Sequence, residues 1–414
     1  MLAGTDLRDT SDPVPTDARR RILLILPAGL SLVAAIDAGL FRIGWPVPLP
    51  QSDLPLAHGP LMVCGFLGTL IGLEKAVALE KKWAYLGVAA TAAGGVGLIV
   101  ATHATLPRLL FLVGSLGFVS VSATFLAKHR TDANACVHAG ALLWSVANAL
   151  FLLGWPIFAV VPAWMGFLLL TVAGERLELN RLLSPSRSSR FAFFVAVASA
   201  VGAIVLAGIG FARGGSVVFF EGGNRFTSSG FDHALRLLGF SCAGIGLWLL
   251  ANDMARVAWK RPGLSRFMAV SLLAGYFWLT ISGGLSMLHG AVVAGETYDA
   301  VLHSFFLGFV FSMIFAHGPI ILPAVVSRSL VFHPSFYAHV VILHAGLALR
   351  LVGDLTDLAW ARSWGALLNA IAILLFLLST ALRMATGGPR NTRDEAGAPQ
   401  RATTVAGKIS ITSR

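Results

Sequence analysis

The sequence predicts an all-α polytopic membrane protein with about twelve transmembrane helices. Three observations predict this class: an apolar composition, a series of apolar windows long enough to cross a bilayer, and basic residues that concentrate in alternate loops. Of 414 residues, 56% are hydrophobic and 12% are charged. Because a soluble domain carries about 25% charged residues, the composition excludes a soluble enzyme of this length.

Twelve apolar windows approach the length of about 20 residues that a spanning helix needs. They are 21–43, 53–73, 83–102, 107–127, 134–153, 156–175, 191–212, 232–251, 265–288, 298–322, 335–353 and 361–384. The first window follows three arginines, as in a signal peptide. It is a full span long, however, and no small-residue cleavage site precedes the second window, so we expect an uncleaved helix.

The windows define one transmembrane domain, 21–385, between two polar segments. We expect residues 1–20 and 386–414 to be disordered tails, because they are polar and contain few apolar residues to bury. The longest loop on the expected outer side, 213–231, is rich in glycine and serine. We expect it to be a flexible connector or a lid.

Basic residues concentrate in the loops after even-numbered windows. Those loops hold fourteen: Lys75, Lys81, Lys82, Lys128, Arg130, Arg176, Arg181, Arg187, Arg190, Arg256, Lys260, Arg261, Arg266 and Arg328. The loops after odd-numbered windows hold five: Arg42, Arg108, Arg213, Arg225 and Arg362. The positive-inside rule then places the even loops and both termini in the cytoplasm. We expect a multi-pass protein of the bacterial inner membrane.

The net charge of +11 follows the same rule, because the basic residues lie in short clusters between apolar windows. We therefore expect membrane lipids, and no nucleic acid, as partners. The three cysteines, Cys64, Cys136 and Cys242, all lie inside apolar windows without a paired spacing. They indicate packing residues, with neither a disulfide framework nor a zinc site.

Two histidines lie at matched depth on two windows that run in the same direction. His58 follows Asp53 by five residues, and His303 follows Tyr298 by five residues. At about 1.5 Å per residue, both lie roughly 8 Å below the outer boundary. A six-coordinate haem between helices needs two such ligands, and neutral imidazole is suitable. The alternative is a pair of unrelated histidines at helix starts.

Other polar residues near that depth have two interpretations each. Asp299 lies one helical turn before His303, so it could hold the imidazole tautomer or cap the helix start. Arg236, Arg350 and Arg362 are outer-side cations that could bind haem propionates or place their charges at the membrane interface.

Three further histidines lie on the expected inner side. His317 is near the inner end of the tenth window, and His339 and His344 are on the eleventh. The last two are five residues apart, which points them about 140° away from each other. His317 with one of them could form an inner metal site. Hydrogen bonds within the bundle, or a proton path, are the alternatives.

The stretch from His58 to Phe66 and the stretch from Asp299 to Gly308 resemble two motifs of the NnrS-like family. The family's second-helix pattern, HxHEMxFGF, is similar here at His58, Met62, Gly65 and Phe66. Its tenth-helix pattern, DAxLHxxxxG, is similar at Asp299, Ala300, Leu302, His303 and Gly308. The two stretches also resemble the second and tenth helices of haem–copper oxidase catalytic subunits.

The resemblance implies a haem–copper oxidase subunit I-like bundle with a low-spin, b-type haem near the outer face, and a role in nitric oxide metabolism, denitrification or nitric oxide stress. It also implies a quinol or a small redox donor as partner. The sequence departs from both patterns, however. Pro60 and Phe305 stand where those families carry histidine, and the sixth and seventh windows contain none. The usual copper ligands are therefore absent, and copper stays possible only at a different site, which His317, His339 and His344 could build.

Two other functions fit the same topology. A secondary transporter without haem also commonly has twelve spans, and the tetrapeptide AHGP at 57–60 and 316–319 is compatible with an internal repeat. A non-catalytic assembly factor for a haem or copper reductase would bind the metal without turnover. If the protein is an enzyme, we expect a membrane oxidoreductase acting on nitric oxide or a related small molecule.

Overall fold

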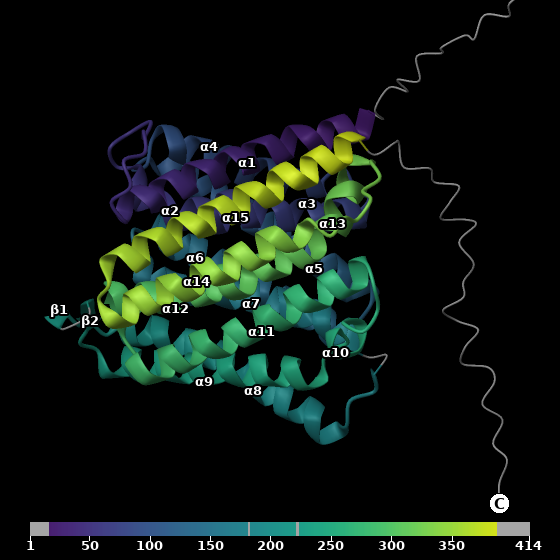
Figure 1. The fold of residues 1–414 in the computed structure, drawn as a ribbon. Helices are drawn as coiled ribbons and strands as arrows, with labels where there is room; N and C mark the ends of the chain where they lie inside the picture. Colours follow the sequence, from purple (N-terminus) through teal and green to yellow (C-terminus); the bar gives the residue numbers. More distant parts are fainter. Residues whose placement is uncertain (1–15, 181–182, 221–222, 387–414) are drawn as a thin grey trace, which may run out of the picture.

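The computed structural model describes residues 16–180, 183–220 and 223–386. They form a bundle of long helices with a small sheet at one end (Figure 1). The predicted class, an all-α polytopic membrane protein, is confirmed by the number of long apolar helices. The first helix begins at Thr16, inside the segment expected to be a tail, and the last ends at Thr386. The rest of both expected tails lies outside the described residues.

The helices follow one another in chain order. They are α1 Thr16–Arg42, η1 Leu54–Ala57, α2 His58–Pro60, η2 Leu61–Gly68, α3 Thr69–Leu79, α4 Ala84–Val100, α5 Thr105–Lys128, α6 Asp132–Leu152, α7 Ile157–Asn180, α8 Arg187–Ala212, α9 Ser229–Asn252, α10 Ala255–Ala258, α11 Leu264–His289, α12 Glu296–His303, η4 Ser304–Phe311, α13 Ser312–Val326, α14 Phe336–Thr356 and α15 Ala359–Thr386.

Eleven helical segments among the described residues are long and apolar enough to cross a membrane. Two of them are composite: Leu54–Leu79 joins η1, α2, η2 and α3, and Glu296–Val326 joins α12, η4 and α13. The third expected window corresponds to α4, which has 17 residues and is about 25 Å long. The start of α1 and the end of α15 lie at the same end of the bundle (Figure 1). Counting α4 with the eleven longer segments gives twelve, an even number, as two helix ends at the same end of the bundle require.

Small residues let α4 approach α1 and η2 closely. A Cβ added at Gly95 would lie 2.3 Å from Ser31 Oγ and 3.1 Å from the Cα of Gly65. Such contacts are typical of helices that associate in lipid, where dispersion forces replace the hydrophobic effect. They fix the second span against α1.

The first and last helices lie side by side (Figure 1). The Trp45 ring, just after α1, makes an edge contact with Trp364 on α15 at 5.3 Å between centroids. Its indole N–H also donates to the carbonyl of Ser363 at 3.0 Å. These contacts join the end of the first helix to the start of the last helix, at the end of the bundle that carries His58.

Part of the loop expected to be a flexible connector or a lid is a sheet. Strand β1 (Val217–Phe220) pairs antiparallel with β2 (Gly223–Phe226), which pairs with β3 (Val292–Ala294). Valine and phenylalanine favour strands, and β3 comes from the distant connection between α11 and α12. The glycines of the loop predicted flexibility. The sequence could not show that a strand from a distant connection pairs with this loop and orders it.

Candidate functional site

His58 is part of the second span, and its side chain is held against α1. Its Nδ1 lies 2.7 Å from the carbonyl oxygen of Ala35. A carbonyl can only accept, so Nδ1–H donates and Nε2 keeps its lone pair. On the same helix, Gly39 lies directly against the ring: an added Cβ would be 2.8 Å from His58 Cε1. The imidazole is therefore fixed in both tautomer and position by α1.

His303 has the same tautomer for a similar reason. Its Nδ1 lies 3.0 Å from the carbonyl oxygen of Asp299 and 3.1 Å from Asp299 Oδ1. Both are acceptors, so Nδ1–H donates and Nε2 is again unprotonated. Asp299 does not cap α12, whose N-cap is Gly295. Of the two interpretations of Asp299, the contacts favour the one that orients the histidine.

Arg350 on α14 holds Asp299 from the other side. Its Nε and Nη2 donate to the two carboxylate oxygens at 2.7 and 2.8 Å. A bidentate pair of this kind fixes the carboxylate plane as well as its charge. The buried carboxyl of Asp354 lies one helical turn after Arg350 on α14. His303, Asp299 and Arg350 thus form the carboxylate–histidine arrangement that commonly supports a metal ligand.

The fold brings His58 and His303 together. Their ring centroids are 6.2 Å apart and the rings are tilted by 35°. Two imidazoles that bind one metal atom from opposite sides, at about 2 Å each, have centroids roughly 6 Å apart. No other residue of the described ranges forms a hydrogen bond with either Nε2. Two unprotonated nitrogens are therefore available between the second and tenth spans.

Both spans contain a π-helical segment close after the histidine: it begins three residues after His58 and one residue after His303. The segments are η2 in the second span and η4 in the tenth, each of eight residues. Phe66 of η2 stacks on Phe311 of η4 at 6.1 Å between centroids. π-helical segments are rare in proteins, and those that occur are frequently found at functional sites. The wider turns move the side chains after His58 and His303 to a new face of each helix.

The three arginines predicted as propionate partners lie in different places. Arg350 pairs with Asp299, and Arg362 pairs with Glu296 at the start of α12. Arg236 pairs with Asp232 at 2.7 Å and donates to two carbonyls at the end of α11. Its helix, α9, lies on the side of the bundle away from α1 and α15 (Figure 1).

The three histidines expected on the inner side, His317, His339 and His344, have separate surroundings. His317 Nε2 accepts from Arg176 Nη2 at 2.8 Å, and His344 Nδ1 accepts from Trp278 Nε1 at 3.0 Å. His339 is fully buried, 4.6 Å from Phe315 between ring centroids, and neither of its nitrogens has a described hydrogen-bond partner. No contact among described residues joins these three imidazoles to one another.

Sequence reasoning missed several residues of the site around His58 and His303. Gly39 and the Ala35 carbonyl position His58, but no motif marks them. Arg42 is exposed at the end of α1 and has no described hydrogen bond or ion pair. The sequence indicates Arg42 only as a loop charge, although it is the last residue of the helix that carries Ala35 and Gly39. Its position along α1 would suggest a place near His58 only if the contact between α1 and the second span were known.

A partly buried group of charges on the expected inner side was also missed. Lys75 lies 2.8 Å from Glu175 and 3.2 Å from Glu74, and the next residue, Arg176, is the partner of His317. The sequence indicated Lys75 and Arg176 only as charges of the positive-inside rule. Their contacts join the second, sixth and tenth spans near one end of the bundle.

The described residues contain no group of three or more His, Cys, Asp or Glu side chains that could hold a metal ion. A haem iron takes only its axial ligands from the protein, since the porphyrin supplies the other four. The chemistry and separation of His58 and His303 fit that requirement.

One family model matches the chain across residues 21–385, and its description is "Domain of unknown function (DUF8744)". The match covers most of the chain. The protein belongs to this family. The DUF8744 match includes His58 and His303 and extends from the first described span into the last. Comparisons with curated proteins and with solved structures find no match.

Proposed function

We propose that this DUF8744 protein is a haem-binding protein of the bacterial inner membrane, with His58 and His303 as axial ligands of a b-type haem. The observation that carries the proposal is the 6.2 Å separation of the two rings, each with Nδ1 hydrogen-bonded and Nε2 without a described partner. In this proposal the bundle is haem–copper oxidase subunit I-like, with both termini cytoplasmic and the haem toward the outer face.

The residues around the pair have distinct parts in this proposal. Asp299 and Arg350 orient His303, while Ala35 and Gly39 fix His58. Arg42 is the cation most available for a propionate, because Arg350 and Arg362 already pair with carboxylates. When bound, the haem would supply one-electron chemistry. With both axial positions taken by histidine, electron transfer is favoured over direct binding of a substrate to the iron.

We place this activity in nitric oxide metabolism or the response to nitric oxide stress, as the NnrS-like motifs imply. A quinol or a small redox protein is the proposed electron donor. Copper is left out of the site, because Pro60 and Phe305 stand in place of the histidines that related motifs carry.

The direct test is an absorption spectrum with iron and copper analysis on the purified full chain. We expect a Soret band, α and β bands that sharpen on reduction, and about one iron per chain, as a six-coordinate low-spin haem requires. Protein that is folded, made in haem-replete cells and still without iron or a Soret band would contradict the proposal.

Replacing Gly39 with alanine is expected to displace His58 and weaken haem binding. An added Cβ would lie 2.8 Å from the ring, so the imidazole must move. Loss of correct ligand support typically costs about 10–100-fold in metal affinity. Gly29→Ala is the matched control, since it is on the same helix with nothing within 4 Å of the added Cβ. Haem content after purification measures both; equal content in the two variants would contradict the role of Gly39.

A secondary transporter without haem is the second candidate. The observation that favours it is the presence of π-helical segments within the second and tenth spans, which also carry the two AHGP sequences. Irregular helices at matched places are typical of transporter repeats. Substrate uptake into proteoliposomes by iron-free protein would support this function. A haem-loaded protein without turnover would instead favour the assembly factor.

A further inference from the structure

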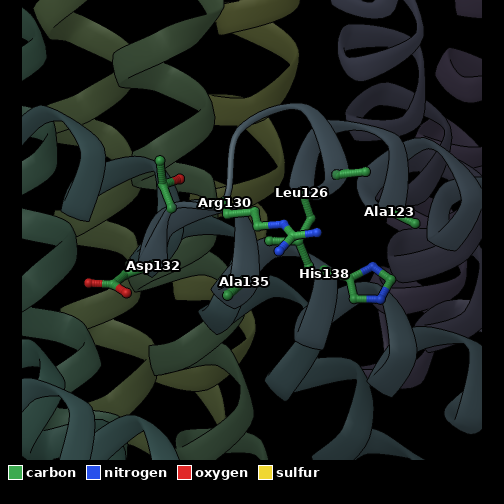
Figure 2. A pocket seen from close by; sticks show the side chains of 8 residues that line it. Ala123, Leu126, Arg130, Asp132, Ala135 and His138 are labelled. Atoms are coloured by element: carbon green, nitrogen blue, oxygen red, sulfur yellow. The ribbon is translucent and has the colours of Figure 1, made fainter.

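A pocket of about 520 Å³ lies at the other end of the bundle from the histidine pair, where α5 ends and α6 begins. Figure 2 shows the side chains that line it. One wall is apolar and comes mainly from α5, and the opposite wall comes from the connecting loop and the first turns of α6. The lining residues are Ala123, Leu126, Ala127, Arg130, Thr131, Asp132, Ala135 and His138.

The polar part of this pocket is basic. Arg130 is exposed and forms no hydrogen bond or ion pair with another residue of the described ranges. In Figure 2 its guanidinium lies over the pocket on the side of His138, whereas the Asp132 carboxylate points away. That carboxylate pairs with Arg190 of α8 at 2.9 Å. The one acidic side chain of the lining is therefore already neutralised from outside.

His138 lines the same side of the pocket. Its Nδ1 lies 3.0 Å from the hydroxyl oxygen of Ser122, and that hydroxyl donates to the carbonyl of Val119 at 2.9 Å. His138 Nδ1–H therefore donates to Ser122, which fixes the ring against α5, and Nε2 keeps its lone pair. Because this nitrogen cannot donate to an anion, the charge that would bind an anionic group is that of Arg130.

The pocket also crosses the boundary between apolar and polar surroundings. The fourth span ends at Lys128 and the fifth begins at Asp132, so Arg130 lies at the level of lipid headgroups. Ala123, Leu126 and Ala127 extend the pocket along the apolar part of α5. A ligand that fits has an anionic head and an apolar tail. Basic pockets between spans bind phospholipid headgroups in this way.

We propose that this pocket binds one anionic phospholipid, with its phosphate on Arg130 and an acyl chain along Ala123 and Leu126. The proposal does not depend on the haem function. A basic side chain near the membrane surface strengthens the attraction to an anionic lipid by about fivefold, so Arg130 should give the pocket a measurable preference for anionic over zwitterionic headgroups.

The test is native mass spectrometry of the purified full chain in a neutral detergent. The protein is titrated with phosphatidylglycerol or with phosphatidylcholine of the same acyl chains. We expect the first phosphatidylglycerol to bind about fivefold more weakly to Arg130→Gln than to the unchanged chain, with phosphatidylcholine unaffected. Lys128→Gln is the matched control, because it removes the same charge from an exposed residue outside the pocket lining.

Two further arms distinguish the source of the anion and the role of the pocket. Ala135→Phe, which fills the pocket without changing charge, should also weaken the first phosphatidylglycerol. Excess inorganic phosphate should not displace the lipid; displacement would assign the site to soluble anions and overturn the proposal. It would also be overturned if Arg130→Gln and Lys128→Gln bound phosphatidylglycerol equally, or if the unchanged chain bound both lipids equally.

Discussion

Changing His58 or His303 to alanine is expected to abolish the six-coordinate haem spectrum. Each residue supplies one of the two unprotonated Nε2 atoms between the second and tenth spans. Removing an axial ligand should cost more than the roughly 10–100-fold that changes behind a ligand cost. We expect either variant to purify with little haem, or with a five-coordinate spectrum, and the double variant to purify without any.

His233→Ala is the control for this prediction. His233 is on α9, is exposed, and hydrogen-bonds the carbonyl of Ser229 in its own helix. It should keep the full Soret intensity. The comparison uses absorbance per chain and iron per chain for folded, monodisperse protein. An unchanged spectrum in the double variant would remove His58 and His303 as ligands.

Changing Arg350 to methionine is expected to lower the free energy of unfolding by about 3 kcal/mol. Arg350 has an 8% exposed side chain and is the bidentate partner of Asp299. Removing one partner of a buried ion pair typically costs about 3–5 kcal/mol, because the other charge stays buried. The lower end applies since the Asp299 side chain keeps 23% exposure. Haem binding should weaken too, because Asp299 would no longer be held against His303.

The control is Arg362→Met, which removes an ion pair to Glu296. Glu296 is on α12, the helix that also carries Asp299. Both side chains of that pair are more than one quarter exposed, so its loss should cost less than about 1 kcal/mol. Thermal unfolding in one detergent measures both variants. Combining Arg350→Met with Asp299→Asn should recover part of the loss. Equal destabilisation by the two arginine variants would contradict the importance of the Asp299 pair.

The depth of each histidine could be predicted from the sequence because window length and loop charge fix how far a residue lies along a span. That argument placed His58 and His303 at one level, and the fold brings their rings together. The same argument could not assign partners to the inner histidines. Several polar residues lie near the same end of the bundle as His317. Only the packing of the helices shows that Arg176 is its partner.

The role of Asp299 shows where a helical spacing stops being informative. Its place one turn before His303 allowed both a cap and a support for the imidazole. The start of α12 at Gly295 and the arrival of Arg350 from α14 favour the second. Neither the helix start nor the neighbouring helix can be read from the four residues between Asp299 and His303.

The sequence by itself determined the class of the protein, the approximate spans and the depth of its polar residues, because burial of apolar residues in lipid and the positive-inside rule act along the chain. The tertiary structure decided which residues at one depth meet. Gly39 against His58, Arg350 on Asp299 and β3 beside β2 all join segments far apart in sequence. Those contacts depend on side-chain shape and helix packing, which no local pattern of residues specifies.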